Sequence, residues 1–363
     1  MAKNPREDLN QQNKLLQKQN DLLEQNNQLL QQVLNKKLEI STATNEEEFV
    51  ENINEDEMRD GFLVNSHRKK LWNVQIGLIN EFARICKKHN LPWFAYGGTL
   101  LGAARHKGFI PWDDDVDLGM LRSDYEKFKQ IAATEIKEPY YLDLWYNYRY
   151  EGDKVSNPAE VDLPMITIEE KKRYNGWWPF FPILKIRDSR TLILEFPNRK
   201  TCHQGIWIDI FPLDPSPPFA NNQQAALFQA KKILMAAAVA PNVIEEALAN
   251  NQKLVIETNA LKQFLNNTHR QKGIYLDNFM IKNFYNSEYV KHITLDHRNY
   301  KTENFRNLTY LPFEKIEMPV PVNYDEVLSI DYGDWHKMVY THSHSMQWSS
   351  DISYKEYFKS SAF

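Results

Sequence analysis

The stretch YGGTLLGAARHKGFIPWDDDVDLGM, residues 96–120, constrains this chain more than any other part of its sequence. It opens with a glycine turn and closes with four carboxylates in five positions: Asp113, Asp114, Asp115 and Asp117. Like charges at this density repel one another, and a solvated loop gains nothing from such crowding. The apolar Val116 predicts instead an extended segment packed on a core, with Asp115 and Asp117 projecting from one side, about 6–7 Å apart along the strand.

Paired carboxylates on one side of a strand suit a divalent cation, which also removes their mutual repulsion. The sequence therefore predicts a site for one or two Mg²⁺ (or Mn²⁺) ions. Gly97, Gly98 and Thr99 follow a predicted strand and precede a predicted helix, where main-chain N–H groups favour a phosphate. An EF-hand loop is disfavoured because its sixth position would be Leu118 instead of glycine, and a solvated acidic turn is disfavoured by the apolar neighbours. Together these features indicate metal-assisted phosphoryl-type transfer.

Charge and composition exclude several classes of protein. The formal net charge of −4 over 363 residues gives no global attraction to nucleic acid or to an anionic membrane. Two cysteines do not make a disulfide scaffold and fit a reducing compartment. The polar composition of residues 1–40 predicts no signal peptide there, and no apolar run approaches the ~20 residues of a membrane span. A cytoplasmic protein without a transmembrane segment is expected.

Changes in composition along the chain indicate four parts. In residues 1–43, rich in Gln and Asn, leucine pairs repeat every seven positions, which predicts either a coiled coil that could join copies into a homo-oligomer or a disordered tail. Residues 44–64 are expected to form an acidic linker and residues 65–345 the catalytic domain, with a helical insertion at 220–290. Residues 346–363 would form a C-terminal tail.

Periodic patterns within the domain predict a mixed α+β fold. An apolar stripe predicts a helix that ends near Asn90, and residues 181–188 and 205–214 are typical of buried strands. Ser123 and Glu126 have the spacing of a capping box, which predicts a helix beginning at Ser123.

Four ordered motifs resemble those of LicD family proteins, relatives of fukutin and fukutin-related protein within the nucleotidyltransferase-fold superfamily. They are the 96–120 stretch, KIRD, GIWIDIFPLD and LPFEKIEMPVPVNYDEVLSIDYGDW, and the likeness runs from about residue 70 to 340. The resemblance implies a nucleotidyltransferase-like mixed sheet with flanking helices, in which Asp115 and Asp117 form the catalytic pair and Asp209 supplies the third carboxylate. A lone aspartate within IWIDIF is costly to bury unless it binds something, which agrees with that role. The segment HKGFIPWDD lengthens the usual spacing, so that Asp113 is a further candidate ligand.

The resemblance also implies the chemistry: transfer of phosphocholine or a related phospho-alcohol from CDP-choline or another CDP-alcohol to a hydroxyl of a surface glycan, with release of CMP. Lys185 and Arg187 alternate along their strand and are expected to face the donor phosphates, with Arg105 as another candidate. Two alternatives remain open at this point. One is a true nucleotidyltransferase, which attacks the phosphate next to the nucleoside; the other is a non-catalytic interaction protein.

Overall fold

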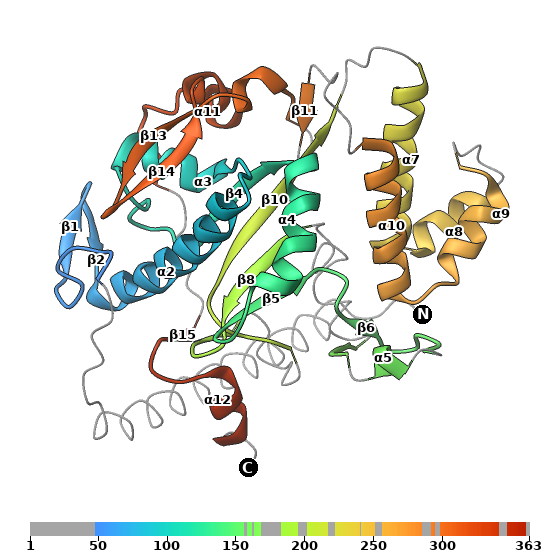
Figure 1. Cartoon of the computed structure of the whole chain (residues 1–363), viewed down its shortest axis with the longest axis horizontal. Coiled ribbons are helices and arrows are strands. Elements are labelled where there is room, and N and C mark those ends of the chain that lie inside the picture. Colours follow the sequence, from blue (N-terminus) through green and yellow to red (C-terminus); the bar gives the residue numbers. More distant parts are fainter. Residues whose placement is uncertain are drawn as a thin grey trace, which may run out of the picture.

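The computed structural model of the chain is a mixed α+β fold, as the patterns predict (Figure 1). It describes residues 48–155, 158–161, 163–167, 183–194, 202–216, 222–239, 241–250, 256–284, 292–294, 298–340 and 347–360. The predicted coiled coil of residues 1–43 lies outside these ranges. Residues Cys86 and Cys202 are both buried free thiols, as expected.

One mixed sheet forms the centre of the fold. Its core runs in the order β5–β8–β10–β4–β3, in which β4 and β10 are parallel and the other pairs are antiparallel. A short pair, β11–β12, continues from the far end of β10. The strands are β3 (Phe94–Ala95), β4 (Asp117–Leu121), β5 (Tyr140–Leu144), β8 (Leu184–Asp188), β10 (Trp207–Pro215), β11 (His292–Thr294) and β12 (Tyr300–Lys301).

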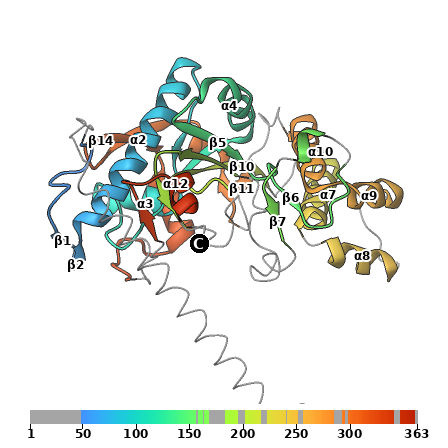
Figure 2. The same ribbon diagram turned by 90° about the horizontal axis from the view of Figure 1, so that it is seen from below.

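One face of this sheet is apolar and lies under two helices, α2 (Ser66–Lys88) and α4 (Arg122–Glu135) (Figure 2). Alternate strand residues such as Leu118, Ile208 and Ile186 are fully buried, because successive side chains of a strand point to opposite faces. The predicted helical stripe is confirmed: α2 begins after Asn65, whose side chain accepts a hydrogen bond from the main-chain N–H of Arg68. The polar residues of the same strands therefore point to the opposite face.

The predicted capping box is wrong. Helix α4 begins at Arg122, so Ser123 lies inside it and makes no cap. The Glu126 side chain pairs with Arg122 (2.8 Å), which also contacts Asp214 on β10, and Lys231 completes this buried cluster. Asp214 therefore joins the sheet to the helical part of the chain.

Among its described residues, the helical insertion predicted at 220–290 contains four helices, which share a hydrophobic core with Trp145 and Tyr146. They are α7 (Asn222–Val239), α8 (Pro241–Ala249), α9 (Thr258–Leu265) and α10 (His269–Phe284). Helix α10 contacts α4 and thereby joins this block to the sheet (Figure 1). Within the described ranges, no helix combines the length and the apolar character that crossing a membrane requires.

The remaining elements are short and lie around the sheet. Residues 48–64, expected as a linker, include buried Val50 and Val64 and the hairpin β1–β2, so this part packs on the domain. The other elements are β1 (Glu57–Arg59), β2 (Phe62–Val64), α3 (Gly97–Leu101), β6 (Arg149–Tyr150), α5 (Pro158–Val161), β7 (Met165–Ile166), β9 (Leu192–Ile193), β13 (Leu308–Phe313), β14 (Ile316–Pro321), α11 (Tyr324–Tyr332), β15 (Trp348–Ser349) and α12 (Tyr354–Ser360).

Candidate active site

Strand register places two of the predicted carboxylates side by side. Asp117 on β4 is the direct partner of Asp209 on β10, and Asp209 is in turn the partner of Lys185 on β8. Residues directly opposite each other on neighbouring strands point to the same face. The three side chains therefore form one row on the face opposite α2 and α4.

The Asp209 carboxylate is held from two sides. Its Oδ1 lies 2.8 Å from Lys185 Nζ, and its Oδ2 accepts a hydrogen bond from Trp207 Nε1 at 3.0 Å. The Lys185 ammonium also lies over the Trp207 ring, 4.3 Å from its centre. Asp209 is therefore oriented by Lys185 and Trp207, which lie on the sheet beside it.

The glycine turn packs against the carboxylates. Gly97 has a positive φ of 51°, and a Cβ there would lie 3.1 Å from Asp117 Oδ2; a Cβ at Gly98 would lie 3.0 Å from Asp113 Oδ2. The Thr99 hydroxyl accepts a hydrogen bond from the main-chain N–H of Asp117 at 2.8 Å. The turn thus allows the acids to approach the start of α3 closely.

The carboxylates form one electrostatic unit. Carboxylate oxygens of Asp113, Asp114 and Asp115 lie within 4.8 Å of one another. Burial, followed by the charge of Asp115, raises the pKa of Asp113 to about 9. Burial and the charges of Asp115 and Asp209 raise the pKa of Asp117 well above its usual range. Such a cluster is the kind of oxygen-donor set that Mg²⁺ or Mn²⁺ binds, because a divalent cation offsets the repulsion that adds to the effect of burial on these pKa values.

A pocket of about 330 Å³ opens beside Gly98 and Asp113. Its other wall comes from a part of the chain more than 200 residues later. It is lined by Gly98, Leu101, Arg105, Ile110, Trp112, Asp113, Tyr332, Asp334, Trp335, Lys337 and Val339. The pocket is large enough for part of a nucleotide-sized ligand.

The three predicted phosphate-binding cations have different surroundings. Lys185 is in the row with Asp117 and Asp209. Arg187 is buried two residues further along β8, where its Nε donates to Asp143 Oδ2 at 2.7 Å and its guanidinium also donates to a main-chain carbonyl. Arg105 lines the pocket and donates to the carbonyls of two residues in the opposite wall, each at 3.1 Å.

Sequence reasoning missed the pocket wall formed by the end of α11 and the residues after it. Tyr332 lies in the pocket, and burial together with the charges of Asp331 and Asp117 raises the pKa of its phenol. Like any tyrosine phenol, it is a hydrogen-bond donor at neutral pH. The motif SIDYGDW contains Tyr332 and Trp335, but nothing in its local pattern indicates a contact with the glycine turn.

Comparison with known proteins fits this geometry. Residues 90–221, which include the glycine turn, the acidic cluster and Asp209, match the model of the family described as LicD/FKTN/FKRP, nucleotidyltransferase domain. The chain carries a LicD-family domain. It is also similar to the lipopolysaccharide cholinephosphotransferase LicD of Haemophilus influenzae, with 27% identity over 272 residues that cover 73% of this chain and 89% of that protein.

A second relative of the chain is the ribitol 5-phosphate transferase FKRP of Homo sapiens. The two are 35% identical over 117 residues, which is 28% of this chain. The match spans 20% of the length of FKRP. Residues 48–89 and the pocket wall after residue 221 lie outside the range that the family model matches.

Proposed function

We propose that this protein transfers phosphocholine or a related phospho-alcohol from a CDP-activated donor to a hydroxyl of a cell-surface polysaccharide, releasing CMP. The row of Asp117, Asp209 and Lys185, together with a pocket that Gly98 and Asp113 help to line, lies in a domain similar to that of the LicD family and carries the proposal. The two relatives are named as a cholinephosphotransferase and a ribitol 5-phosphate transferase, so phospho-alcohol transfer is the chemistry common to their names.

Asp113, Asp115, Asp117 and Asp209 would hold one or two Mg²⁺ or Mn²⁺ ions. All four offer carboxylate oxygens, which suit a hard divalent cation, and burial together with the charges of neighbouring carboxylates raises the pKa of Asp113 and of Asp117. Bound metal would neutralise the charge of the donor's diphosphate and stabilise the leaving group.

The chain's own groups would then bind and orient the reactants. The pocket would take the CDP-alcohol, with Tyr332 donating a hydrogen bond and Lys185 adding positive charge. Asp209, held by Trp207 and Lys185, would accept the proton of the acceptor hydroxyl. The hydroxyl oxygen forms a bond to the distal phosphorus, the bond from that phosphorus to the CMP oxygen breaks, and CMP leaves.

Incubation with a panel of CDP-alcohols tests the proposal. The panel comprises the choline, ethanolamine, glycerol and ribitol donors, each with Mg²⁺ or Mn²⁺ and a polysaccharide acceptor. We expect CMP from at least one donor, incorporation of the phospho-alcohol into the acceptor, and neither product with Asp117→Asn. A separate incubation with a nucleoside triphosphate tests the alternative: release of pyrophosphate there, without CMP from any CDP-alcohol, would indicate a nucleotidyltransferase instead. Absence of both CMP and pyrophosphate would indicate a non-catalytic protein.

A further inference from the structure

The acidic cluster is braced by residues that precede the matched family domain. We propose that Arg59 of the β1–β2 hairpin and Trp72 of α2 are positioning residues that hold the acidic loop at Asp113 in its active geometry. The inference rests on the proposed function, since it assigns a role to these residues in that same site.

Helix α2 fixes the main chain of the acidic loop. The Asp113 carbonyl accepts hydrogen bonds from Trp72 Nε1 at 3.0 Å and from Arg68 Nη1 at 2.8 Å. The next carbonyl, that of Asp114, accepts one from Gln75 Nε2 at 2.8 Å. Three side chains from one helix thus set the direction of two successive peptide groups, and with it the direction in which the carboxylates project.

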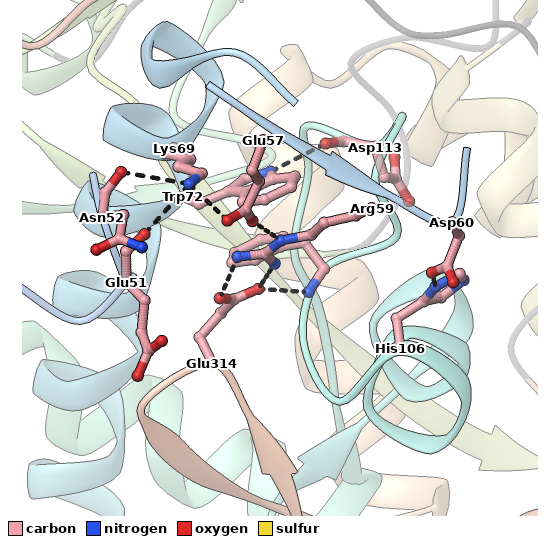
Figure 3. Close-up of polar contacts among 11 residues, drawn as sticks. Glu51, Asn52, Glu57, Arg59, Asp60, Lys69, Trp72, His106, Asp113 and Glu314 are labelled. Atoms are coloured by element: carbon pink, nitrogen blue, oxygen red, sulfur yellow. Dashed lines mark hydrogen bonds and ion pairs between the residues drawn. The ribbon is translucent and has the colours of Figure 1, made fainter. Parts of the chain in front are cut away.

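Trp72 is in turn fixed by stacking. Its ring lies parallel to that of Phe109, with the centres 4.7 Å apart, and the Arg59 guanidinium lies 5.3 Å from the centre of the Trp72 ring. Figure 3 shows Arg59 over the indole ring of Trp72, and the indole N–H points to Asp113. A planar guanidinium suits this contact better than an ammonium does.

Glu314, in the turn between β13 and β14, anchors Arg59. Its two carboxylate oxygens receive Arg59 Nη1 at 2.5 Å and Nη2 at 3.1 Å, and Oε1 also accepts from the main-chain N–H of Phe109 at 3.3 Å. A Cβ at Gly108 would lie 2.2 Å from Glu314 Oε1, so only glycine allows this approach. The segment HKGFIPW, which lengthens the spacing between the glycine turn and the aspartates, therefore has a structural role: it contacts the Glu314 carboxylate.

The charges of this cluster balance among themselves. Glu57 contacts both Arg59 and Lys69, with Lys69 Nζ at 2.9 Å, and Lys69 is fully buried. Two cations thus face two anions, Glu57 and Glu314 (Figure 3). A neutral, internally paired cluster offers no charge to a ligand, so its effect on catalysis acts through the position of the acidic loop.

Two substitutions with matched controls test the inference in the full-length protein. Trp72→Phe keeps an aromatic ring but removes the N–H donor to Asp113, and Arg59→Met removes the Glu314 bridge. The controls are Trp93→Phe, a tryptophan that contacts Phe82, and Arg84→Met, which breaks an exposed bridge to Glu81 on α2 itself. Misplacement of a reacting group by about 1 Å can cost about 10²-fold in rate.

We expect kcat for CMP release to fall about 10-fold in Trp72→Phe and about 30-fold in Arg59→Met, with KM for the donor changed less than about threefold and both controls near wild type. Amide hydrogen exchange of residues 109–118, measured without donor, should accelerate in the same two variants only. Unchanged kcat and unchanged exchange in both variants would overturn the inference. So would a loss of kcat that merely follows a drop in Tm, or a rise in KM at constant kcat. If the wild-type protein releases no CMP, the proposed function is refuted and with it the catalytic part of this inference. If the wild type is active but hydrogen exchange is unaltered in the two variants, this inference alone is refuted.

Discussion

Replacing Asp209 with asparagine should remove most of the turnover and little of the stability. Asparagine keeps the size and one acceptor oxygen, so the hydrogen bond from Trp207 Nε1 can remain. It loses the charge that pairs with Lys185 and that accepts the acceptor's proton. We expect kcat for CMP release to fall about 10²–10⁴-fold.

The expected stability change follows from the neighbours of Asp209. The Lys185 and Asp209 side chains are 6% and 11% exposed, and loss of one partner from a buried pair costs about 3–5 kcal/mol. Lys185 also interacts with Asp117, and the substitution relieves the repulsion between Asp117 and Asp209. Both effects offset the loss, so the free energy of unfolding should fall by only about 1–2 kcal/mol.

Asp143→Asn is the matched control for this substitution. Asp143 lies in the same row across the sheet, is buried, and pairs with Arg187, outside the acidic cluster. Urea unfolding and CMP release should be measured on both variants without and with Mg²⁺. Asp143→Asn should lose at least as much stability as Asp209→Asn but keep its turnover. A near-normal kcat in Asp209→Asn, accompanied by a lower free energy of unfolding, would refute the role of Asp209 and make Asp113 the next candidate base.

Three further outcomes are expected. Because the pKa of Asp113 in the folded protein is raised to about 9 from 3.8, Asp113 binds its proton more tightly in the folded state, so its contribution to the stability of the metal-free protein should fall as pH rises from about 4 to about 9. Over that range, the urea concentration at the unfolding midpoint should decline less for Asp113→Asn than for the wild type. Equal declines in the two proteins would contradict the raised pKa of Asp113. Arg122→Met should lower the free energy of unfolding by about 3–5 kcal/mol, because it leaves buried Asp214 short of a partner; the donor KM should stay constant in the same preparation. Deletion of residues 1–47 should change the oligomeric state seen by light scattering but leave the turnover unchanged. Deletion of residues 1–60, which also removes strand β1 and Arg59, should reduce the turnover as well. Equal activity of the two truncated proteins would argue against a role for the β1–β2 hairpin.

Local patterns were sufficient for much of the fold. The apolar stripe of α2, the strands β8 and β10 and the helical insertion follow from periodicity and composition, which depend only on neighbours along the chain. The capping box failed because Glu126 has a stronger partner in Arg122, on the same helix but bound also to a distant strand. A short motif carries no information about such competition.

The sequence by itself determined which side chains are costly to place: crowded aspartates after a glycine turn, and a lone aspartate in an apolar strand. Only the tertiary structure decided which of them meet. Strand register puts Asp117, Asp209 and Lys185 in one row, and a one-residue shift of that register would turn a side chain to the other face. Only the tertiary structure likewise places Tyr332 in the pocket wall and Arg59 against Glu314. Contacts between segments far apart in sequence depend on the packing of the whole domain, which no local pattern encodes.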